Sequence, residues 1–207
     1  MEQQHQTLRG LYIVTPDWDD TARLLTVTEQ ALQGGAAIVQ YRHKTAQPLQ
    51  RMEQAAALLS LCRQYQKPLI INDHLDLCQA LDADGLHVGG TDIDVAAARA
   101  ALGEHKIVGA SCYGDLQRAK DAAAAGASYI AFGGFYPSRI KKYDFRTEYD
   151  IVSEAAGIGL PRVVIGGMTL ENCQPLVQRG SEMVAAISSV YFEEDPQAAA
   201  RAFAALF

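Results

Sequence analysis

Polar and charged side chains stand at the ends of several short apolar runs of this chain. One run leads directly into Gln40, Arg42 and Lys44, and another leads into Asn72 and Asp73. The interior of a buried strand does not select such residues. In a parallel α/β barrel the carboxyl ends of the strands build the active site, so polar residues confined to those ends indicate chemistry rather than stability.

Two aspartates extend this pattern. Asp73 and Asp92 come just after the third and the fourth predicted strands, and neighbouring barrel strands bring their carboxylates together. Mg²⁺ is usually held by one or two carboxylates, by water and by phosphate oxygens of a substrate. We therefore predict a magnesium site with a diphosphate as its ligand. The alternative for either aspartate is an N-cap of the helix that follows.

Small residues end the last two predicted strands. Gly166 and Gly167 follow the seventh, and Ile187 and Ser188 follow the eighth. Barrels often hold a phosphate with backbone N–H groups of these two loops. A glycine pair alone more often makes only a tight turn. Its position in the repeat favours a phosphate site here, with Thr169 placed to cap the next helix.

Eight strand-like runs must position these residues. Most are continuous apolar stretches, as expected for strands that are covered on both faces. The runs comprise residues 10–15, 36–41, 68–72, 85–88, 107–111, 129–132, 162–165 and 183–188.

Segments with apolar residues at helical spacing connect the strand-like runs. Asp195 followed by Pro196 is typical of the start of a closing helix. Three further helices are predicted from apolar faces formed by Leu24, Val27 and Ala31, by Leu49, Met52, Ala56 and Leu59, and by Leu116, Ala119 and Ala123. The eight units predict an α/β fold, a single-domain (βα)₈ TIM barrel over residues 1–207 with a polar N-terminal extension, residues 1–9. A doubly wound open sheet shares the local pattern, but the count favours the barrel.

Composition and charge disfavour several classes of protein. The 207 residues suffice for one core, and 49% hydrophobic with 20% charged residues is typical of a globular chain. A net charge of −6 disfavours nucleic acid as a partner, no apolar run reaches membrane-spanning length, and the polar N-terminus lacks a signal-peptide core. The four widely spaced cysteines fit reduced thiols in a cytoplasmic protein. We expect small-molecule partners, and a homo-oligomer is compatible with the sequence.

Several motifs together resemble the thiamine phosphate synthase family, over the chain from Gly10 to about Phe203. Any single motif would be weak, but their number and order make the resemblance specific. The matching segments are Gln40-Tyr41-Arg42-His43-Lys44, Ile71-Asn72-Asp73, Asp84-Gly85-Leu86-His87-Val88-Gly89, Gly109-Ala110-Ser111, Phe132-Gly133-Gly134-Phe135-Tyr136-Pro137 and Ile165-Gly166-Gly167-Met168.

The resemblance implies that 4-amino-5-hydroxymethyl-2-methylpyrimidine diphosphate is joined to a thiazole phosphate or to its carboxylated form. In such a reaction diphosphate leaves first, and the thiazole nitrogen captures the resulting pyrimidinylmethyl cation to give thiamine phosphate. This dissociative chemistry asks for positioning and for stabilisation of the departing charge rather than for a protein nucleophile. The implied cofactor is Mg²⁺.

The resemblance also implies roles for individual residues. Those expected to hold the diphosphate are Arg42, Lys44, Asn72 and Lys141, with Mg²⁺ on Asp73 and Asp92. Those expected at the pyrimidine or its leaving group are Gln40 and Ser111. Those expected at the thiazole phosphate are the backbone groups of Gly167, Ile187 and Ser188. Further implied binding residues are Tyr41, Ser138, Arg139 and Ile140, and the implied catalytic residues are Arg42, Lys44, Ser111 and Lys141.

The chain departs from the family pattern at two places. Gly90 stands where the family usually carries a glutamine before the x-Asp pair, so an amide contact is lost while Asp92 remains. In the sixth loop Ile140 replaces a hydroxyl residue, whereas Ser138 keeps the other hydroxyl as donor and acceptor. The contacts to the thiazole are the ones that these changes weaken.

Some candidate residues also have simpler interpretations. Arg42 and Lys44 could form a solvated pair beyond a strand, and Lys141 could belong to a solvated basic run. Ser111 could be a small strand-end residue or a helix cap. The other motifs favour functional roles for Arg42 and Lys44, and the position of Lys141 soon after the sixth predicted strand favours one there.

Other polar residues near the predicted site are interpreted as structural. The spacing of His43, His74 and His87 lacks a recognised zinc-ligand motif. Tyr12 and Tyr129 are predicted to pack inside the barrel.

Three rival functions stay open. A thiazole tautomerase of the same fold would need a proton-transfer residue, but the relevant position here is Tyr113, whose reference pKa is high. A phosphosugar aldolase or epimerase would use Lys44 as a Schiff-base amine, without further support from the sequence. A noncatalytic barrel that binds thiazole phosphate would keep the binding residues. Mg²⁺-dependent turnover separates these functions.

Overall fold

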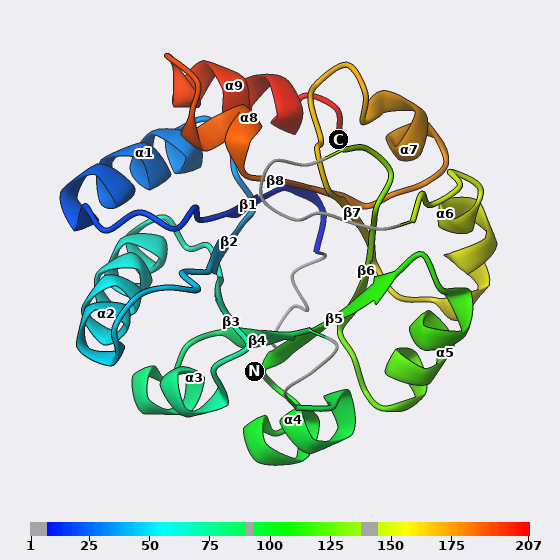
Figure 1. Ribbon diagram of the computed structural model, residues 1–207, viewed down its shortest axis with the longest axis horizontal. Coiled ribbons are helices and arrows are strands. Elements are labelled where there is room, and N and C mark those ends of the chain that lie inside the picture. The colour runs from blue at the N-terminus through cyan, green and yellow to red at the C-terminus, as the bar shows by residue number, and fades with distance from the viewer. Residues whose placement is uncertain (1–7, 90–92, 138–144) are drawn as a thin grey trace.

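Eight parallel strands close into a barrel in this computed structural model, which describes residues 8–89, 93–137 and 145–207. The strands follow one another around the barrel in chain order, and the last pairs with the first (Figure 1). Their bounds are β1 Gly10–Val14, β2 Ile38–Tyr41, β3 Leu69–Asn72, β4 Gly85–Val88, β5 Ile107–Tyr113, β6 Tyr129–Gly133, β7 Arg162–Ile165 and β8 Met183–Ala186. The predicted (βα)₈ barrel is thus confirmed, and the rival open sheet is wrong.

Helices form the outer layer of the barrel (Figure 1). Their bounds are α1 Thr21–Gln33, α2 Pro48–Gln64, α3 Leu75–Leu81, α4 Val95–Leu102, α5 Leu116–Ala124, α6 Ile151–Glu154, α7 Gln174–Gln178, α8 Ser188–Tyr191 and α9 Pro196–Ala204, with a 3₁₀ helix at Ala155–Ile158. The predicted start of α9 is confirmed, because the Asp195 carboxylate accepts a hydrogen bond from Ala198 N at 2.9 Å. No helix of the described chain combines the length and the apolar character needed to cross a membrane.

The period of two along each strand divides the core into two layers. Leu11 and Ile13 of β1 face the helices and join the larger cluster, while Tyr12 and Val14 face the barrel interior. The interior layer is completed by residues of other strands, namely Ile38, Ile70, Tyr129, Ala131, Val163, Met183 and Ala185. The interior is therefore filled by side chains up to the level of the strand ends.

The buried face of α2 differs from the predicted one. Leu49 is 72% exposed and Met52 37% exposed, and Ala56 is exposed as well, whereas Gln54 is completely buried. The Tyr41 hydroxyl donates to Gln54 Oε1 at 3.0 Å, and Gln54 Nε2 donates to Trp18 O at 2.9 Å. Because these hydrogen bonds satisfy the amide, the helix buries a polar residue that an apolar pattern assigns to the outside.

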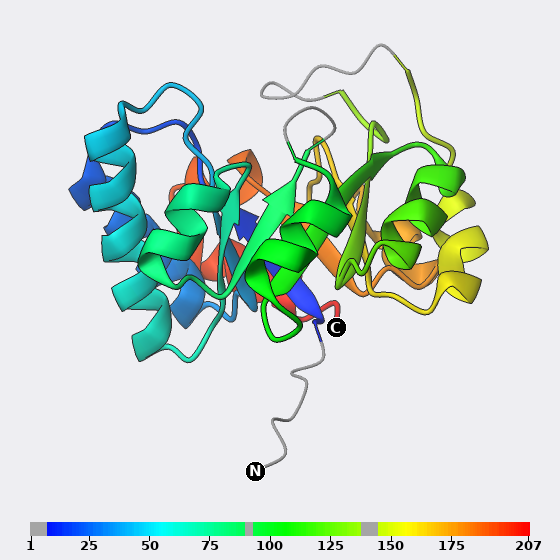
Figure 2. The same cartoon turned by 90° about the horizontal axis from the view of Figure 1, so that it is seen from below.

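The loops that follow the strands gather at one end of the barrel (Figure 2). The C-terminus lies at the opposite end in the same view. The strand ends that carry the polar residues therefore share one face with the longer loops. This is the functional face of such a barrel.

Candidate active site

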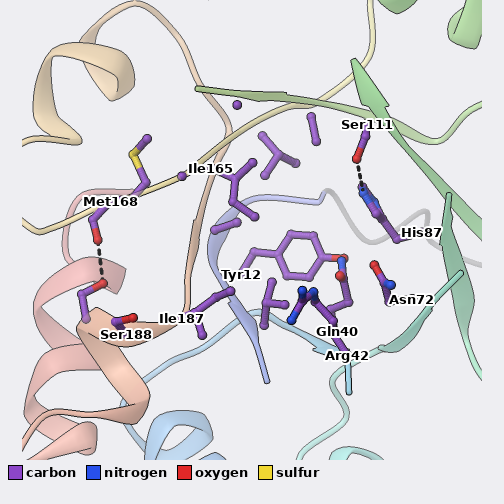
Figure 3. A pocket seen from close by; sticks show the side chains of 18 of the residues that line it. Tyr12, Gln40, Arg42, Asn72, His87, Ser111, Ile165, Met168, Ile187 and Ser188 are labelled. Carbon is purple, nitrogen blue, oxygen red and sulfur yellow. Dashed lines mark hydrogen bonds between the residues drawn. The ribbon is translucent and has the colours of Figure 1, made fainter. Parts of the chain in front are cut away.

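A cavity of about 540 Å³ lies at the carboxyl ends of the strands (Figure 3). Every strand of the barrel contributes to its walls, either directly or through the residues that follow it. The predicted site residues that line the cavity are Gln40, Arg42, Lys44, Asn72, Asp73, Ser111, Gly167, Ile187 and Ser188. Closure of the barrel thus brings together residues that lie far apart in the sequence, from Gln40 to Ser188.

The other predicted site residues divide into two cases. The Tyr41 side chain is buried away from the cavity walls, where its hydroxyl donates to Gln54 of α2. The predictions on Asp92, Ser138, Arg139, Ile140 and Lys141 lie outside the residues that the structure describes. The sixth-loop contacts and the second metal ligand therefore stay predictions.

Asp17 and Thr15, in the loop after β1, hold the segment that carries the two cations. Arg42 Nη1 lies 3.2 Å from Asp17 Oδ1, and the same oxygen accepts a hydrogen bond from Lys44 N at 2.8 Å. Thr15 Oγ1 accepts from Arg42 N at 2.8 Å and donates to Arg42 O at 2.9 Å. The Arg42 side chain is only 14% exposed and that of Lys44 is 57% exposed, so the alternative of a solvated pair fails for Arg42 but not for Lys44.

Asp73 is held in a left-handed backbone conformation with φ 61°. Its carboxylate accepts hydrogen bonds from Asn72 Nδ2 at 2.6 Å and from Gly89 N at 3.1 Å, and Lys44 Nζ lies 3.8 Å from Oδ2. A non-glycine residue with positive φ carries strain, which persists where surrounding contacts impose it. The contacts across β3 and β4 thus aim this carboxylate at the cavity.

The helix-cap alternative fails at Asp73. His74 is the N-cap of α3, and the carboxylate of Asp73 makes its bonds to Asn72 and Gly89. The N-cap of α4 is Asp94, whose Oδ1 accepts from Ala97 N at 2.7 Å. The alternative for Asp92 itself lies outside the described residues.

The donor set at Asp73 fits Mg²⁺. Each carboxylate oxygen keeps a lone pair beyond the one that accepts from Asn72 or Gly89, and hard oxygen ligands are those that Mg²⁺ selects. Among the residues described, no group of three or more histidine, cysteine, aspartate or glutamate side chains surrounds a common point. A magnesium ion here would depend on few carboxylates and on the phosphate oxygens of a substrate.

A hydrogen-bonded set of side chains crosses the barrel interior below the cavity. Tyr12 Oη lies 2.7 Å from both Gln40 Nε2 and Tyr129 Oη. His87 Nδ1 lies 2.9 Å from Tyr129 Oη, and His87 Nε2 lies 2.9 Å from Ser111 Oγ. The predicted packing role of the two tyrosines is confirmed, since both are buried and their rings meet edge to face. Their hydroxyls additionally connect Gln40 to Ser111.

Burial keeps these phenols protonated. It raises the pKa of Tyr12 and of Tyr129 above the usual value, because a phenolate loses its solvation inside the barrel. Gly109 makes room for the Tyr129 ring, since a Cβ at this position would overlap the ring atoms. The packing of the Tyr129 ring thus requires a residue without a side chain at the first position of the Gly109-Ala110-Ser111 segment.

The other end of the cavity is lined by glycine and by backbone groups. Gly166 and Gly167 have φ 102° and 64°, and a Cβ on Gly167 would overlap the Pro137 carbonyl oxygen. Thr169 Oγ1 accepts from Asn172 N at 3.2 Å, so Thr169 caps the turn that precedes α7 rather than α7 itself. β8 ends at Ala186, two residues before the predicted strand end at Ser188, and Ile187 is the N-cap of α8.

Sequence reasoning missed several residues of this site. Asp17 follows β1 and satisfies the same strand-end rule that selected Asp73, so a signal was present. His87 was set aside because it matched no zinc motif, yet it lines the cavity and bonds to Ser111. Phe192 and Glu193 also line the cavity, and no local pattern in the sequence distinguishes them from surface residues.

Comparison with known proteins agrees with this geometry. A family model described as thiamine monophosphate synthase matches residues 11–190. A thiamine-phosphate synthase of Janthinobacterium sp. (strain Marseille) is 62% identical over 97% of each chain, and one of Methylobacillus flagellatus is 49% identical over 97% of this chain and 96% of that protein.

A solved structure supports the same conclusion. The thiamine phosphate pyrophosphorylase from Pyrococcus furiosus superposes with a TM-score of 0.84 at 28% identity, over 97% of this chain and 96% of that one. Family model, sequence relatives and structure therefore agree over almost the whole chain. The chain belongs to the thiamine monophosphate synthase family.

Proposed function

We propose that this chain joins 4-amino-5-hydroxymethyl-2-methylpyrimidine diphosphate to the thiazole phosphate, forming thiamine phosphate and releasing diphosphate. The observation that carries the proposal is that one cavity is lined both by the cationic side chains of Arg42 and Lys44 and by glycine and backbone groups that follow β7 and β8, Gly167 and Ser188. Figure 3 shows Arg42 and Ser188 at separate parts of this cavity. We propose that the two parts bind two different anions. A reaction between a diphosphate and a monophosphate needs such a pair of regions in reach of each other.

The cationic side would hold the diphosphate. Arg42 is a bidentate donor whose segment is fixed by Asp17, and the Lys44 ammonium lies beside the Asp73 carboxylate. A Mg²⁺ ion on Asp73, and on Asp92 as predicted above, would supply additional positive charge to the leaving group. Asn72 would keep the Asp73 carboxylate in place through its 2.6 Å hydrogen bond.

The proposed reaction proceeds by dissociation. The bond between the pyrimidinylmethyl carbon and the diphosphate oxygen breaks, and its electron pair leaves with the diphosphate. The lone pair of the thiazole nitrogen then forms the new bond to that carbon. Fixed charges that stabilise the departing diphosphate lower the barrier to the first step, and alignment in the cavity lowers the barrier to the second. Lys141 is proposed to assist from the sixth loop.

The glycine side would hold the thiazole phosphate. Gly167 permits close approach of a phosphate to the backbone, and Ile187 and Ser188 follow β8 at the usual phosphate position of such barrels. Gln40 and Ser111, which also line the cavity, would contact the pyrimidine. Apolar walls that include Val163 and Ile165 complete the space for the rings.

Formation of thiamine phosphate from the two precursors tests the proposal, with Mg²⁺ and with EDTA. We expect metal-dependent product, and in Asp73→Asn a loss of roughly one hundredfold or more in kcat, comparable to the removal of one strong electrostatic contact. Asp76→Asn is the matched control, since Asp76 is an exposed aspartate at the start of α3. Equal turnover in EDTA would contradict the role of the metal, and isomerisation of the thiazole without product would indicate a tautomerase.

Two further expectations accompany the proposed function. We propose a cytoplasmic location, supported by four cysteines that are all buried free thiols. A homo-oligomer stays a prediction, and sedimentation velocity of the purified chain tests it.

A further inference from the structure

Five side chains form one continuous hydrogen-bonded chain through the barrel interior. It runs from Gln40 through Tyr12, Tyr129 and His87 to Ser111, with neighbouring polar atoms 2.7–2.9 Å apart. Figure 3 shows one end of this chain, Gln40, beside the hydroxyl of the Tyr12 ring, and the other end, Ser111, bonded to His87. Tyr12 and Tyr129 are 1% and 0% exposed, so bulk water does not compete for these bonds.

The hydrogen atoms of this chain all point in the same direction when His87 is neutral and each phenol both donates one hydrogen bond and accepts one within the chain. Each phenol has one hydrogen to donate, and a neutral imidazole donates from one nitrogen and accepts at the other. If Gln40 Nε2 donates to Tyr12, then Tyr12 donates to Tyr129, and Tyr129 donates to His87 Nδ1. The imidazole then carries its hydrogen on Nε2 and donates it to Ser111. In the opposite direction Ser111 donates to His87 Nε2, His87 Nδ1 donates to Tyr129, and Tyr129 donates to Tyr12. Tyr12 then donates to Gln40 Oε1, which requires the Gln40 amide to be turned over.

The direction decides what the cavity presents to a ligand. In the direction that starts at Gln40 Nε2, the amide oxygen Oε1 stays available as an acceptor. Ser111 Oγ accepts from His87, so its own hydrogen is free to be donated into the cavity. In the reverse direction Gln40 presents a donor and Ser111 presents a lone pair. The two directions therefore suit ligands of opposite hydrogen-bond pattern.

An aminopyrimidine distinguishes the two directions. Its ring nitrogen is an acceptor, and the neighbouring exocyclic amino group is a donor, so it needs one donor and one acceptor in return. We propose that Tyr12, Tyr129 and His87 are positioning residues that orient the chain from Gln40 to Ser111, making Ser111 a donor and Gln40 Oε1 an acceptor toward the aminopyrimidine ring. This inference rests on the proposed function for the identity of the ring.

Packing holds the middle of the chain in place. The rings of Tyr12 and Tyr129 meet edge to face with centroids 5.7 Å apart, and the His87 ring stacks on Tyr129 at an interplanar angle of 17°. Gly109 leaves the space that the Tyr129 ring occupies. None of these three rings is free to turn without losing contacts in a filled interior. The chain is thus a fixed part of the barrel rather than a response to ligand.

The tautomer of His87 tests the direction without any substrate. Nitrogen-15 NMR of the intact protein, with histidine labelled, distinguishes a protonated from an unprotonated ring nitrogen. We expect His87 to carry its hydrogen on Nε2 with Nδ1 as acceptor. In Tyr129→Phe, which removes the donor to Nδ1, we expect a shift toward a mixture of tautomers. In Tyr12→Phe the donor from Tyr129 remains, so the tautomer should persist while Gln40 is released.

Selectivity against the 4-oxo analogue of the pyrimidine diphosphate tests whether Ser111 acts as a donor and Gln40 Oε1 as an acceptor toward the ring. This analogue carries N–H next to C=O and so presents the opposite pattern. We expect kcat/KM for the amino substrate to exceed that for the analogue by roughly one hundredfold or more, since a mismatch leaves buried polar groups unpaired. In Tyr129→Phe and Tyr12→Phe we expect this ratio to fall at least roughly tenfold. The KM for the pyrimidine should rise, and the KM for thiazole phosphate should stay within about twofold.

Tyr191→Phe is the matched control. Tyr191 is equally buried and its hydroxyl lies 2.9 Å from Thr28 Oγ1, so the variant also loses a buried phenol, but outside the chain. We expect it to keep the His87 tautomer and the selectivity ratio. A hydrogen on His87 Nδ1 in the unaltered protein would overturn the proposed direction. An unchanged ratio of the two kcat/KM values in both Tyr129→Phe and Tyr12→Phe would overturn it as well.

The proposed direction of the hydrogen bonds and the proposed function can fail separately. If the unaltered protein forms no thiamine phosphate but shows the Nε2 tautomer, the direction of the chain stands and the proposed function falls. If it forms product and shows the Nδ1 tautomer, the function stands and the positioning role falls. The NMR measurement on the unaltered protein also decides the direction if a variant does not fold.

Discussion

The Tyr129 ring occupies the space in which a side chain at Gly109 would lie. A Cβ built on Gly109 overlaps the ring carbons and the hydroxyl oxygen of Tyr129. Gly109 opens the segment that ends at Ser111, and Tyr129 is the middle of the hydrogen-bonded chain that reaches Ser111 through His87. One small residue thus determines both the packing of the interior and the hydrogen bonds below the cavity.

Gly109→Ala should therefore displace the Tyr129 ring. We expect the free energy of unfolding to fall by about 1–3 kcal/mol, the usual cost of overpacking a filled core. Urea unfolding measures it. Gly157→Ala is the matched control, because nothing lies within 4 Å of a Cβ at that position. An equal effect of the two variants would mean that the loss does not come from the Tyr129 ring.

Asp17 pairs with Arg42 and accepts a hydrogen bond from Lys44 N, so under the proposed function it would compete with the diphosphate for Arg42 while it positions Lys44. Asp17→Asn keeps an oxygen to accept from Lys44 N but removes the charge that pairs with Arg42 at 3.2 Å. We expect diphosphate, with Mg²⁺ constant, to bind about 1.5- to fivefold more tightly, since an ion pair near the protein surface, here with Asp17 35% exposed, contributes about 0.2–1 kcal/mol. Calorimetric titration measures this. Asp17→Ala, which also loses the acceptor for Lys44 N, should bind less tightly than Asp17→Asn.

Gly167→Ala should affect the thiazole phosphate side alone. A Cβ on Gly167 overlaps the Pro137 carbonyl oxygen, so the backbone around the anion region must move. We expect the Kd for thiazole phosphate to rise at least roughly tenfold, while diphosphate affinity stays the same. Gly159→Ala is the control, with a similar φ of 79° but open space around its Cβ. Both variants should lose about 1–2 kcal/mol of stability from the left-handed backbone, and only Gly167→Ala should lose the ligand.

Buried thiols should make the fold sensitive to alkali. Burial raises the pKa of Cys62 and Cys112 to about 12, and that of Cys78 and Cys173 to about 11. The unfolded chain, whose thiols have pKa values near 9, then releases protons at lower pH than the folded chain. Ionisation therefore favours unfolding, so the free energy of unfolding should be level below pH 9 and should decrease as the pH rises from about 9 to 12.

Urea unfolding between pH 7 and pH 11 measures this decrease. Cys62→Ala removes one of the titrating groups, so its stability should depend less steeply on pH above 9, although it is less stable at pH 7. A stability that increases above pH 9 would contradict the expected sign.

Local patterns in the sequence determined the barrel and the position of the site. Continuous apolar runs become strands because both faces of a barrel strand are buried, and the polar residues at their ends meet because parallel strands share one carboxyl end. This rule predicts Arg42 and Asn72 at the cavity, and the tendency of barrels to bind phosphate after the seventh and eighth strands predicts Gly167 there. The strand ends are properties of consecutive residues, which is why they could be predicted.

Tertiary structure alone decided the contacts across the barrel. Nothing local distinguishes Tyr12 and Tyr129 from apolar filling, because their hydroxyls meet only after the first and sixth strands face each other in the closed barrel. The same holds for Gln54, whose burial depends on Tyr41 and Trp18. A hydrogen bond between residues far apart in the chain produces no periodic pattern in the sequence. The hydrogen bonds that orient the side chains of the site are therefore visible only in the folded structure.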